Sequence, residues 1–391
     1  MRVTTVSGSR AHRHEEPRRP GESGTHPEPD RDDPARDPDR GPSGTASGIG
    51  SWPGTDIVEA TRISFGELAA PHVPYLPELP ARGPGADLVG RGAGLLVDLP
   101  VDLQPSGWRL VERPGRDLER ARSWLRQDLD VLAEVADGYT GPLKVQVAGP
   151  WTLAATLWLP RLERALVDAG ACRDLVDSLA EGLRQHVTQL RRLVPGAAVR
   201  VQLDEPGLTA VLSGALPTAS GLGRLRALAA PVVEEGLRRV IGAVREAGAD
   251  EVLVHSCAAD VPVSLLVGAG ADGLSLDVTR LGNDGWEAVA AAVEAGVRLW
   301  AGVVPTAATA PAPGATGLGP RPAPTSDLPG DVAVADALWR PWRTLGLPPR
   351  SLDRVVLTPT CGLAGGNPAR ARAVLRRVRE GAAALAERAA G

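Results

Sequence analysis

Three side chains that bind transition metals well follow apolar, β-branched segments of the sequence. His255 and Cys257 close the segment EVLVHSC, and Cys361 closes VVLTPTC. Residues two apart on a strand point to the same side, so His255 and Cys257 can reach one ion from a single strand end, and the distant Cys361 would close the site. Zinc prefers an imidazole together with thiolates, so the pattern predicts a zinc site.

Asp277, which closes GLSLDV, offers an oxygen as a fourth ligand. The four side chains would fill a tetrahedral shell, or leave one position exchangeable if the aspartate binds weakly. The alternative is that a histidine and a small buried cysteine simply end a strand. Structural zinc ligands normally lie close together in sequence, so this dispersed set favours a catalytic site. Zinc lowers the pKa of an incoming thiol, and the thiolate is the nucleophile for S-alkylation.

A second set of residues could bind the two ends of an amino acid. QLDEPGL places Asp204 and Glu205 at a strand end just before a proline–glycine turn. A carboxylate pointing into the mouth of a barrel could hold a substrate ammonium group. The alternatives for this pair are a helix N-cap or a salt bridge at the rim. In GIGSWPG, the backbone and hydroxyl of Gly48, Gly50 and Ser51 could cradle a carboxylate, although a lone glycine-rich turn is a weak signal.

Strand-like and helical segments alternate along the sequence between these residues. A short strand is expected in TASGIGSWPGTD, followed by strands at 143–149, 199–206, 251–257, 273–278, 298–305 and 355–361. Amphipathic helices are expected near 116–136, 172–193, 231–247, 284–296 and 367–388. An eighth segment within 86–99 fits either a strand or a helix. The alternation predicts a parallel sheet covered on its faces, and polar residues at many strand ends favour a single closed (β/α)8 barrel over an open doubly wound sheet.

The start of the chain differs in composition from the rest. Residues 1–47 contain no aromatic residue and are crowded with Arg, Asp, Glu, Pro and Gly. Such a segment cannot bury enough surface to offset its ordering entropy, so we expect a disordered tail over 1–47, which could even precede the true start, and the barrel over 48–391. The Pro/Gly-rich segment 310–330 predicts a mobile loop.

The overall composition excludes several classes of partner. A net charge of −4 with dispersed arginine gives no broad basic field, so nucleic acid is not expected as a partner. No segment approaches the roughly 18 uninterrupted apolar residues of a membrane span. Three cysteines, an odd number, with no apolar secretory segment predict a reducing cytoplasm.

Five segments together resemble the C-terminal catalytic barrel of cobalamin-independent methionine synthase, within the grouping that includes uroporphyrinogen decarboxylase-like barrels. They are GIGSWPGTD, VAGPWTL, QLDEPGL, VHSCAAD with SLDVTR, and TPTCGLAG, in the family's order over about residues 45 to 390. QLDEPGL and TPTCGLAG are the more specific. By this resemblance the zinc ligands fall at His255, Cys257 and Cys361, the family's glutamate ligand at Asp277, the contact to the homocysteine amino group at Asp204, and the carboxylate cradle at Ile49, Gly50 and Ser51.

The sequence also departs from the family pattern. Asp277 is one methylene shorter than the glutamate, about 1.5 Å of lost reach. The family's histidine proton donor should follow the strand at 298–305, but TAATAPAP contains no histidine, and the aromatic folate contact after GPWTL is replaced by Thr156. The chain has no room for the N-terminal barrel that helps to bind methylfolate.

The resemblance implies a zinc-dependent transfer of a methyl group to homocysteine, giving methionine. Methyltetrahydrofolate is the family's donor, and a methylcorrinoid protein is the competing one. Two other hypotheses remain open from the sequence. One is a catalytically silent relative that uses zinc to bind a thiol, and the other is a decarboxylase-like barrel without metal.

Overall fold

The computed structural model describes residues 44–160, 163–306 and 327–390, which lie within one structural unit, Gly41–Gly391. Residues 1–43 of the tail predicted over 1–47, and residues 310–326 of the loop predicted over 310–330, lie outside the described residues. Thr45 and Ala46 form the first strand, so the sheet begins ahead of the boundary predicted at residue 48.

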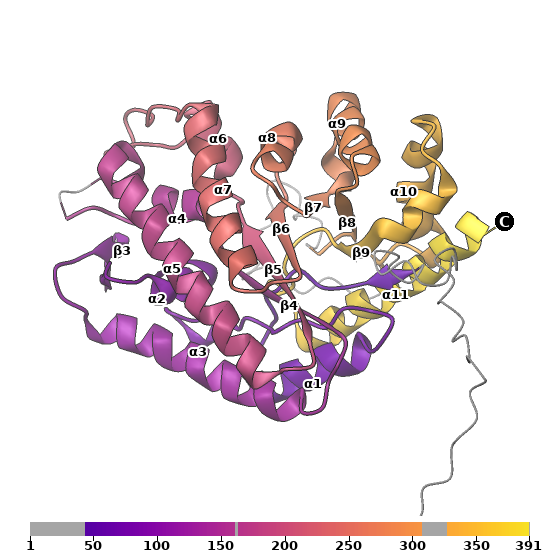
Figure 1. Ribbon diagram of the computed structural model, residues 1–391, viewed down its shortest axis with the longest axis horizontal. Coiled ribbons are helices and arrows are strands. Elements are labelled where there is room, and N and C mark those ends of the chain that lie inside the picture. Colours follow the sequence, from indigo (N-terminus) through magenta and orange to yellow (C-terminus); the bar gives the residue numbers. More distant parts are fainter. Residues whose placement is uncertain (1–43, 161–162, 307–326, 391) are drawn as a thin grey trace, which may run out of the picture. The chain divides into compact units, whose positions relative to one another are not determined.

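Seven parallel strands form one curled sheet in the order β1-β9-β8-β7-β6-β5-β4. The strands are β1 Thr45–Ala46, β4 Pro142–Ala148, β5 Ala198–Asp204, β6 Glu251–Ser256, β7 Gly273–Asp277, β8 Arg298–Val304 and β9 Val355–Pro359. The predicted strands match these to within two residues at each end. In Figure 1 the helices lie around the outside of the sheet. The alternation of apolar strands and amphipathic helices therefore predicted the α/β class correctly.

Eleven α-helices are formed by the described residues. They are α1 Ile57–Glu67, α2 Leu88–Leu95, α3 Arg116–Val135, α4 Pro150–Thr156, α5 Ala169–Leu193, α6 Leu208–Ser213, α7 Ala230–Glu246, α8 Val263–Gly268, α9 Asn283–Glu294, α10 Asp331–Thr344 and α11 Pro368–Ala390. All five predicted helices are present, as α3, α5, α7, α9 and α11. The short helices α4, α6 and α8 follow directly after strands and were not predicted, because they are too short for a 3.6-residue period to show.

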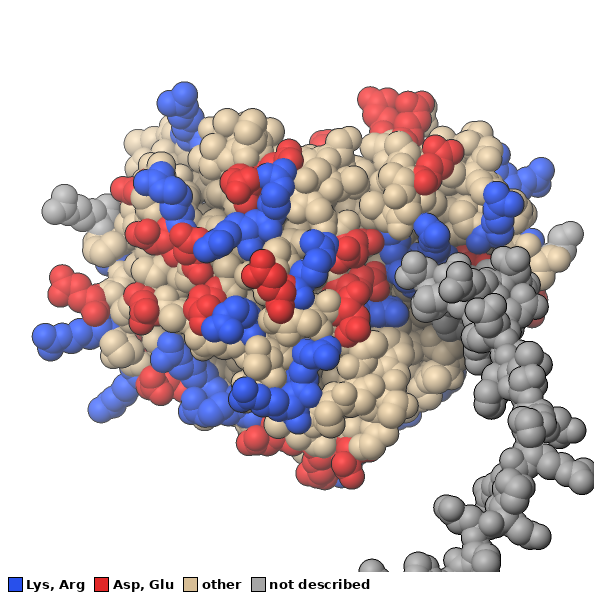
Figure 2. Space-filling view, in the orientation of Figure 1, with Lys and Arg blue, Asp and Glu red and all other residues tan. Residues whose placement is uncertain are grey.

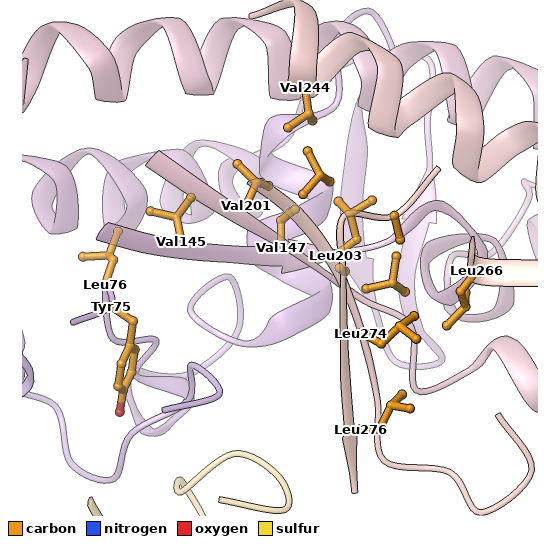
Figure 3. Packing of buried hydrophobic residues seen from close by; sticks show 14 of the residues in the cluster. Tyr75, Leu76, Val145, Val147, Val201, Leu203, Val244, Leu266, Leu274 and Leu276 are labelled. Carbon is orange, nitrogen blue, oxygen red and sulfur yellow. The ribbon is translucent and has the colours of Figure 1, made fainter. Parts of the chain in front are cut away.

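The side chains of the strands divide into two layers with a period of two residues. Figure 3 shows Val145, Val147, Val201 and Leu203 from β4 and β5 in one layer, with Val244 of α7 close to it. These apolar residues are buried on the outer face, under the helices. The residues between them face the interior of the curl, which we call the inner face. The inner face of β4 and β5 is polar and carries Lys144, Gln146, Gln202 and Asp204.

The position between β1 and β4 holds no regular strand. The segment Val73–Glu78 lies there and forms only isolated parallel bridges, Ser47 with Val73 on one side and Tyr75 with Lys144 on the other. Pro74 and Pro77 interrupt this segment and supply no N–H groups, so a continuous ladder cannot form.

The segment within 86–99, which fits either a strand or a helix by its sequence, forms a helix over most of its length. Leu88–Leu95 is the helix α2, and Asp87 caps it by accepting hydrogen bonds from the N–H groups of Val89 and Gly90, at 3.1 and 3.0 Å. An aspartate in this position favours the start of a helix over a strand. The structure thus shows a curled seven-stranded parallel sheet, and the complete eight-stranded barrel that the sequence predicted is not confirmed.

A two-stranded antiparallel hairpin precedes α3 and was not predicted. It pairs β2 Val101–Gln104 with β3 Gly107–Leu110. Gly107 follows the turn with φ of 117°, a region that residues with a Cβ rarely adopt.

Charged side chains of both signs are mixed over the face seen in Figure 2, with arginine next to aspartate or glutamate. Ion pairs within single helices include Arg184 with Glu181 on α5 and Arg238 with Glu234 on α7. Within the described residues no helix is both long and apolar enough to cross a membrane.

Candidate metal and amino-acid site

Three metal-binding side chains meet at the carboxyl end of the sheet. His255 lies on β6, Cys257 follows that strand by one residue, and Cys361 follows β9 by two. One ligand atom from each residue lies within 4.8 Å of the other two, and the two sulfur atoms are 3.6 Å apart. Strands β7 and β8 separate β6 from β9 in the sheet, so the curl of the sheet is what brings the three together.

The imidazole of His255 is oriented by the neighbouring strand. Its Nδ1 lies 2.9 Å from the carbonyl oxygen of Ser275 and 3.1 Å from the Ser275 hydroxyl. A carbonyl oxygen only accepts hydrogen bonds, so Nδ1 is the donor and Nε2 keeps its lone pair. This second contact is the one by which proteins fix a histidine that ligates a metal.

The spacing of the sulfur atoms fits a shared metal ion. Two thiolates on one tetrahedral zinc are separated by about 3.8 Å, given Zn–S bonds of about 2.3 Å, and the observed separation is 3.6 Å. The donors are one nitrogen and two sulfurs, which suit zinc better than a hard ion such as magnesium. The residues present therefore fit a zinc ion with one open position.

The two cysteines affect each other's protonation. The Cys361 thiol donates a hydrogen bond to the Cys257 sulfur, and this bond, with a smaller contribution from the neighbouring His255, lowers the pKa of Cys257 well below its ordinary value. The same contact with Cys257, together with burial, raises the pKa of Cys361. The pair thus favours one thiolate with one shared proton.

The structure does not bring Asp277 into this group. Its Oδ1 accepts hydrogen bonds from the N–H of Thr279 at 3.1 Å and from the Thr279 hydroxyl at 2.5 Å. Asp277 thereby caps the short 3-10 helix Val278–Arg280 that follows β7. The side chain predicted as the fourth ligand is turned toward its own helix.

Asp204 and Glu205, which are adjacent in sequence, point to opposite faces of β5. Asp204 lies on the inner face beside His255, with which it is in register. Gln202 donates a hydrogen bond to its Oδ1 at 2.6 Å, and among the described residues nothing donates to the other oxygen. Burial raises the pKa of Asp204, partly offset by His255 and Lys144.

The Glu205 carboxylate turns outward to the first turn of α4. Its Oε1 accepts from the N–H of Trp151 at 2.9 Å, and its Oε2 accepts from the N–H and the hydroxyl of Thr152, both at 2.7 Å. Burial raises the pKa of Glu205 to about 7, and these hydrogen bonds oppose that shift. Both oxygens are thus used in capping a helix, which is the alternative weighed against substrate binding for this pair.

The turn Ile49–Ser51 follows β1 at the same end of the sheet. Its backbone is held from outside the turn: the N–H of Glu78 donates to the Gly50 carbonyl at 3.1 Å, and the N–H of Leu363 donates to the Ser51 carbonyl at 2.9 Å. Within the described residues no acceptor pairs with the N–H groups of Gly50 or Ser51. A Cβ on Gly50 would come within 2.6 Å of Gln146, so only glycine fits there. Free N–H groups on a tightly held turn are suited to binding a carboxylate.

Sequence reasoning missed two buried charged residues at this site. Glu78 is buried beside the turn, and burial raises its pKa to about 7; Arg91 Nε lies 3.5 Å from its Oε1. Lys144 is fully buried on the inner face of β4. Polar residues two apart in the apolar segment LKVQVAG could have revealed Lys144 and Gln146, whereas the proline-rich PYLPELP gave no signal for Glu78.

Of the positions at which the sequence departs from the family pattern, the structure describes Thr156 but only the start of the segment TAATAPAP. Thr156 ends α4, and its hydroxyl donates to the Thr152 carbonyl at 2.7 Å. The expected position of the histidine proton donor, within TAATAPAP, lies outside the described residues from residue 307 onward.

Comparison with known protein families identifies one family for this chain. A family model described as "Cobalamin-independent synthase, Catalytic domain" matches residues 44–384. A solved B12-independent methionine synthase from Shewanella sp. W3-18-1, in complex with selenomethionine, is 15% identical over 66% of this chain and 67% of that one, with a TM-score of 0.45. A methyltransferase from Methanosarcina mazei is 16% identical over 88% of this chain and 94% of that one, with a TM-score of 0.49. No curated protein sequence matches the chain.

Proposed function

The chain belongs to the family of cobalamin-independent methionine synthase catalytic domains and is a homocysteine methyltransferase, and on this premise we propose that His255, Cys257 and Cys361 hold a zinc ion at which the homocysteine sulfur is methylated. The observation that carries the proposal is the convergence of an imidazole, held through Nδ1 by Ser275, with two sulfurs 3.6 Å apart.

Three protein ligands with an open fourth position are the pattern of a catalytic zinc site. When bound, zinc lowers the pKa of a thiol, so that the homocysteine sulfur is present as the nucleophilic thiolate. The three cysteines of the chain are free thiols, which zinc binding by two of them requires. The cytoplasmic location expected from the cysteine count stays a prediction.

The remaining residues of the site position the amino acid. The N–H groups of Gly50 and Ser51 are the proposed contacts for its carboxylate, and the free oxygen of Asp204 for its ammonium group. Glu78 is a second buried carboxylate beside the turn, and the charges of Asp204 and Lys144 both act on its pKa. With both ends held, the sulfur is directed toward the metal-binding group, which orders it for attack on a methyl group in line.

We propose methyltetrahydrofolate as the methyl donor, because it is the donor of the family to which the chain belongs. No feature of the described residues favours the methylcorrinoid alternative. Thr156, in place of an aromatic residue, removes a stacking surface for the folate ring, so we expect this enzyme to bind the folate less tightly than an enzyme with an aromatic residue there.

The test is zinc stoichiometry in the wild type and in Cys361→Ser, each with and without homocysteine, together with a methyl-transfer assay. We expect about one zinc per wild-type chain, loss of zinc and turnover in Cys361→Ser, and a change in the zinc environment when homocysteine is added to the wild type. Cys172→Ser is the matched control, because Cys172 is buried on α5 outside the site. A metal-free wild type with full turnover would overturn the zinc proposal, and zinc binding without turnover from methyltetrahydrofolate would overturn the choice of donor.

A further inference from the structure

We infer that Lys144 is a positioning residue for the amino-acid substrate, and that its single buried ammonium group holds together the two elements proposed to bind the carboxylate and the amino group of homocysteine. The inference rests on the proposed roles of Asp204 and of the turn Ile49–Ser51, and it deepens them by naming what fixes their geometry.

Burial of the Lys144 ammonium group is unfavourable for the stability of the fold. It is the only lysine of the chain, and its side chain is 0% exposed. Its outer-face neighbours in β4, Leu143 and Val145, are apolar, and burying an ammonium group costs several kcal/mol unless its hydrogen bonds and charge are compensated. Burial lowers the pKa of Lys144 to about 7, while the carboxylates of Asp204 and Glu78 oppose the shift. A packing role alone would be filled better by an apolar side chain of similar length.

All three N–H bonds of the ammonium group are used. Nζ donates to the Ile49 carbonyl at 2.6 Å, to Gln202 Oε1 at 2.9 Å and to Gln146 Oε1 at 3.3 Å. The first of these bonds anchors the carboxylate-binding turn to the inner face of the sheet. Because the C=O and N–H of one trans peptide point in opposite directions, the N–H of Gly50 faces away from Lys144.

The second bond reaches Asp204 through Gln202. Since Gln202 Oε1 accepts from Lys144, its Nε2 must face the other way, and it donates to the Ile49 carbonyl at 2.9 Å and to Asp204 Oδ1 at 2.6 Å. Without the lysine, Gln202 loses the bond to its Oε1 and is held only through Nε2. Lys144 therefore helps to hold Gln202 and, through it, the Asp204 carboxylate by Oδ1, with the other oxygen facing the proposed position of the substrate ammonium group.

The test compares Lys144→Met with the control Arg200→Met. Arg200 is the register partner of Lys144 on β5 and is also a largely buried cation, but it contacts Glu251 at 3.3 Å instead of the turn or Asp204. We expect Lys144→Met to raise the homocysteine KM and the calorimetric Kd by at least about tenfold, with kcat, the KM for the methyl donor and zinc content changed much less. Arg200→Met should leave both homocysteine values unchanged.

Thiols that lack one end of the substrate separate positioning from a general loss of structure. In the wild type, 3-mercaptopropylamine lacks the carboxylate and 4-mercaptobutanoate lacks the amino group, so each should react less well than homocysteine. In Lys144→Met the preference for homocysteine over both analogues should fall. A change for one analogue alone, or an equal rise in KM for Arg200→Met, would overturn the inference.

If Lys144→Met does not fold, Gln202→Met breaks the same connection without removing a buried charge. It should raise the homocysteine KM in the same direction, and an unchanged KM would overturn the inference. A wild type that neither binds nor methylates homocysteine would instead contradict the proposed function, so the two failures are distinguishable.

Discussion

The two ends of the inner face use buried polar groups in different ways. At the amino end Glu251 is surrounded by partners: its Oε1 accepts from Trp300 Nε1 at 3.0 Å and lies 3.6 Å from Arg298 Nε, and its Oε2 lies 3.3 Å from Arg200 Nε. Four apolar side chains fill the interior between this cluster and the other end, Val73, Leu253, Trp300 and Val356.

At the carboxyl end the polar groups are also held by hydrogen bonds, but one oxygen of Asp204 has no hydrogen-bond partner among the described residues. His255 is fixed through Nδ1, which leaves Nε2 as the ring nitrogen that can ligate a metal, and Asp204 is fixed through Oδ1. Parallel α/β sheets place their chemistry at the carboxyl ends of the strands. Burial alone therefore does not mark a functional residue. Glu251 and Asp204 are both buried, but both oxygens of Glu251 have partners, whereas only Oδ1 of Asp204 has one among the described residues.

The largest expected effect is at the metal-binding group. Cys257→Ser removes a thiolate ligand, so we expect loss of zinc and a fall in kcat/KM of more than about 100-fold. Zinc analysis and steady-state assays of the purified variant measure both. Cys172→Ser, at a buried cysteine outside the site, is the control. An equal loss of activity in this variant would show that the loss in Cys257→Ser does not come from the metal-binding group.

Asp204 and Glu205 give the next contrast, because they are neighbours with opposite orientations. Asp204→Asn should raise the homocysteine KM about 10- to 100-fold by removing a charged partner of the substrate ammonium group. Glu205→Gln should leave KM nearly unchanged and lower the free energy of unfolding by about 1–3 kcal/mol, since one of its acceptors at α4 becomes a donor. Kinetics and urea unfolding separate the two, and a reversed pattern would contradict the assignment.

The amino-end cluster should affect stability only. Glu251→Gln removes the charge that pairs with Arg200 and Arg298, so we expect a loss of about 1–3 kcal/mol in the free energy of unfolding. Assays well below the unfolding temperature should give an unchanged homocysteine KM. A changed KM in folded enzyme would show that this end also takes part in binding.

The smallest effect is expected at Asp277, which lies at the carboxyl end but outside the group of three metal-binding side chains, with its Oδ1 bound by Thr279. Asparagine caps helices about as well as aspartate, so Asp277→Asn should change stability by less than about 0.5 kcal/mol. Zinc content and kcat/KM should also stay within about twofold of the wild type. Loss of zinc comparable to that of Cys257→Ser would restore Asp277 as a ligand.

Much of the sheet could be predicted, because each strand carries its signal locally. The segments for β4 to β9 are apolar and β-branched, and the long helices repeat apolar residues with the period of a helix. The segment at 86–99 was ambiguous because Gly and Leu fit both structures, and the Asp87 cap decided for the helix. The segment Val73–Glu78 gave no strand signal because its prolines prevent a regular ladder.

The sequence by itself determined the alternation of strands and helices, the placement of His255, Cys257 and Cys361 at strand ends, and the opposite faces of Asp204 and Glu205, since a strand alternates with a period of two. Only the tertiary structure decided that β6 and β9 bring their ends together, that Asp277 turns to Thr279, and that Lys144 joins the turn Ile49–Ser51 to Asp204. The physical reason is range: strand and helix patterns follow from neighbouring residues, whereas these contacts join segments that only the curl of the sheet brings within hydrogen-bond distance.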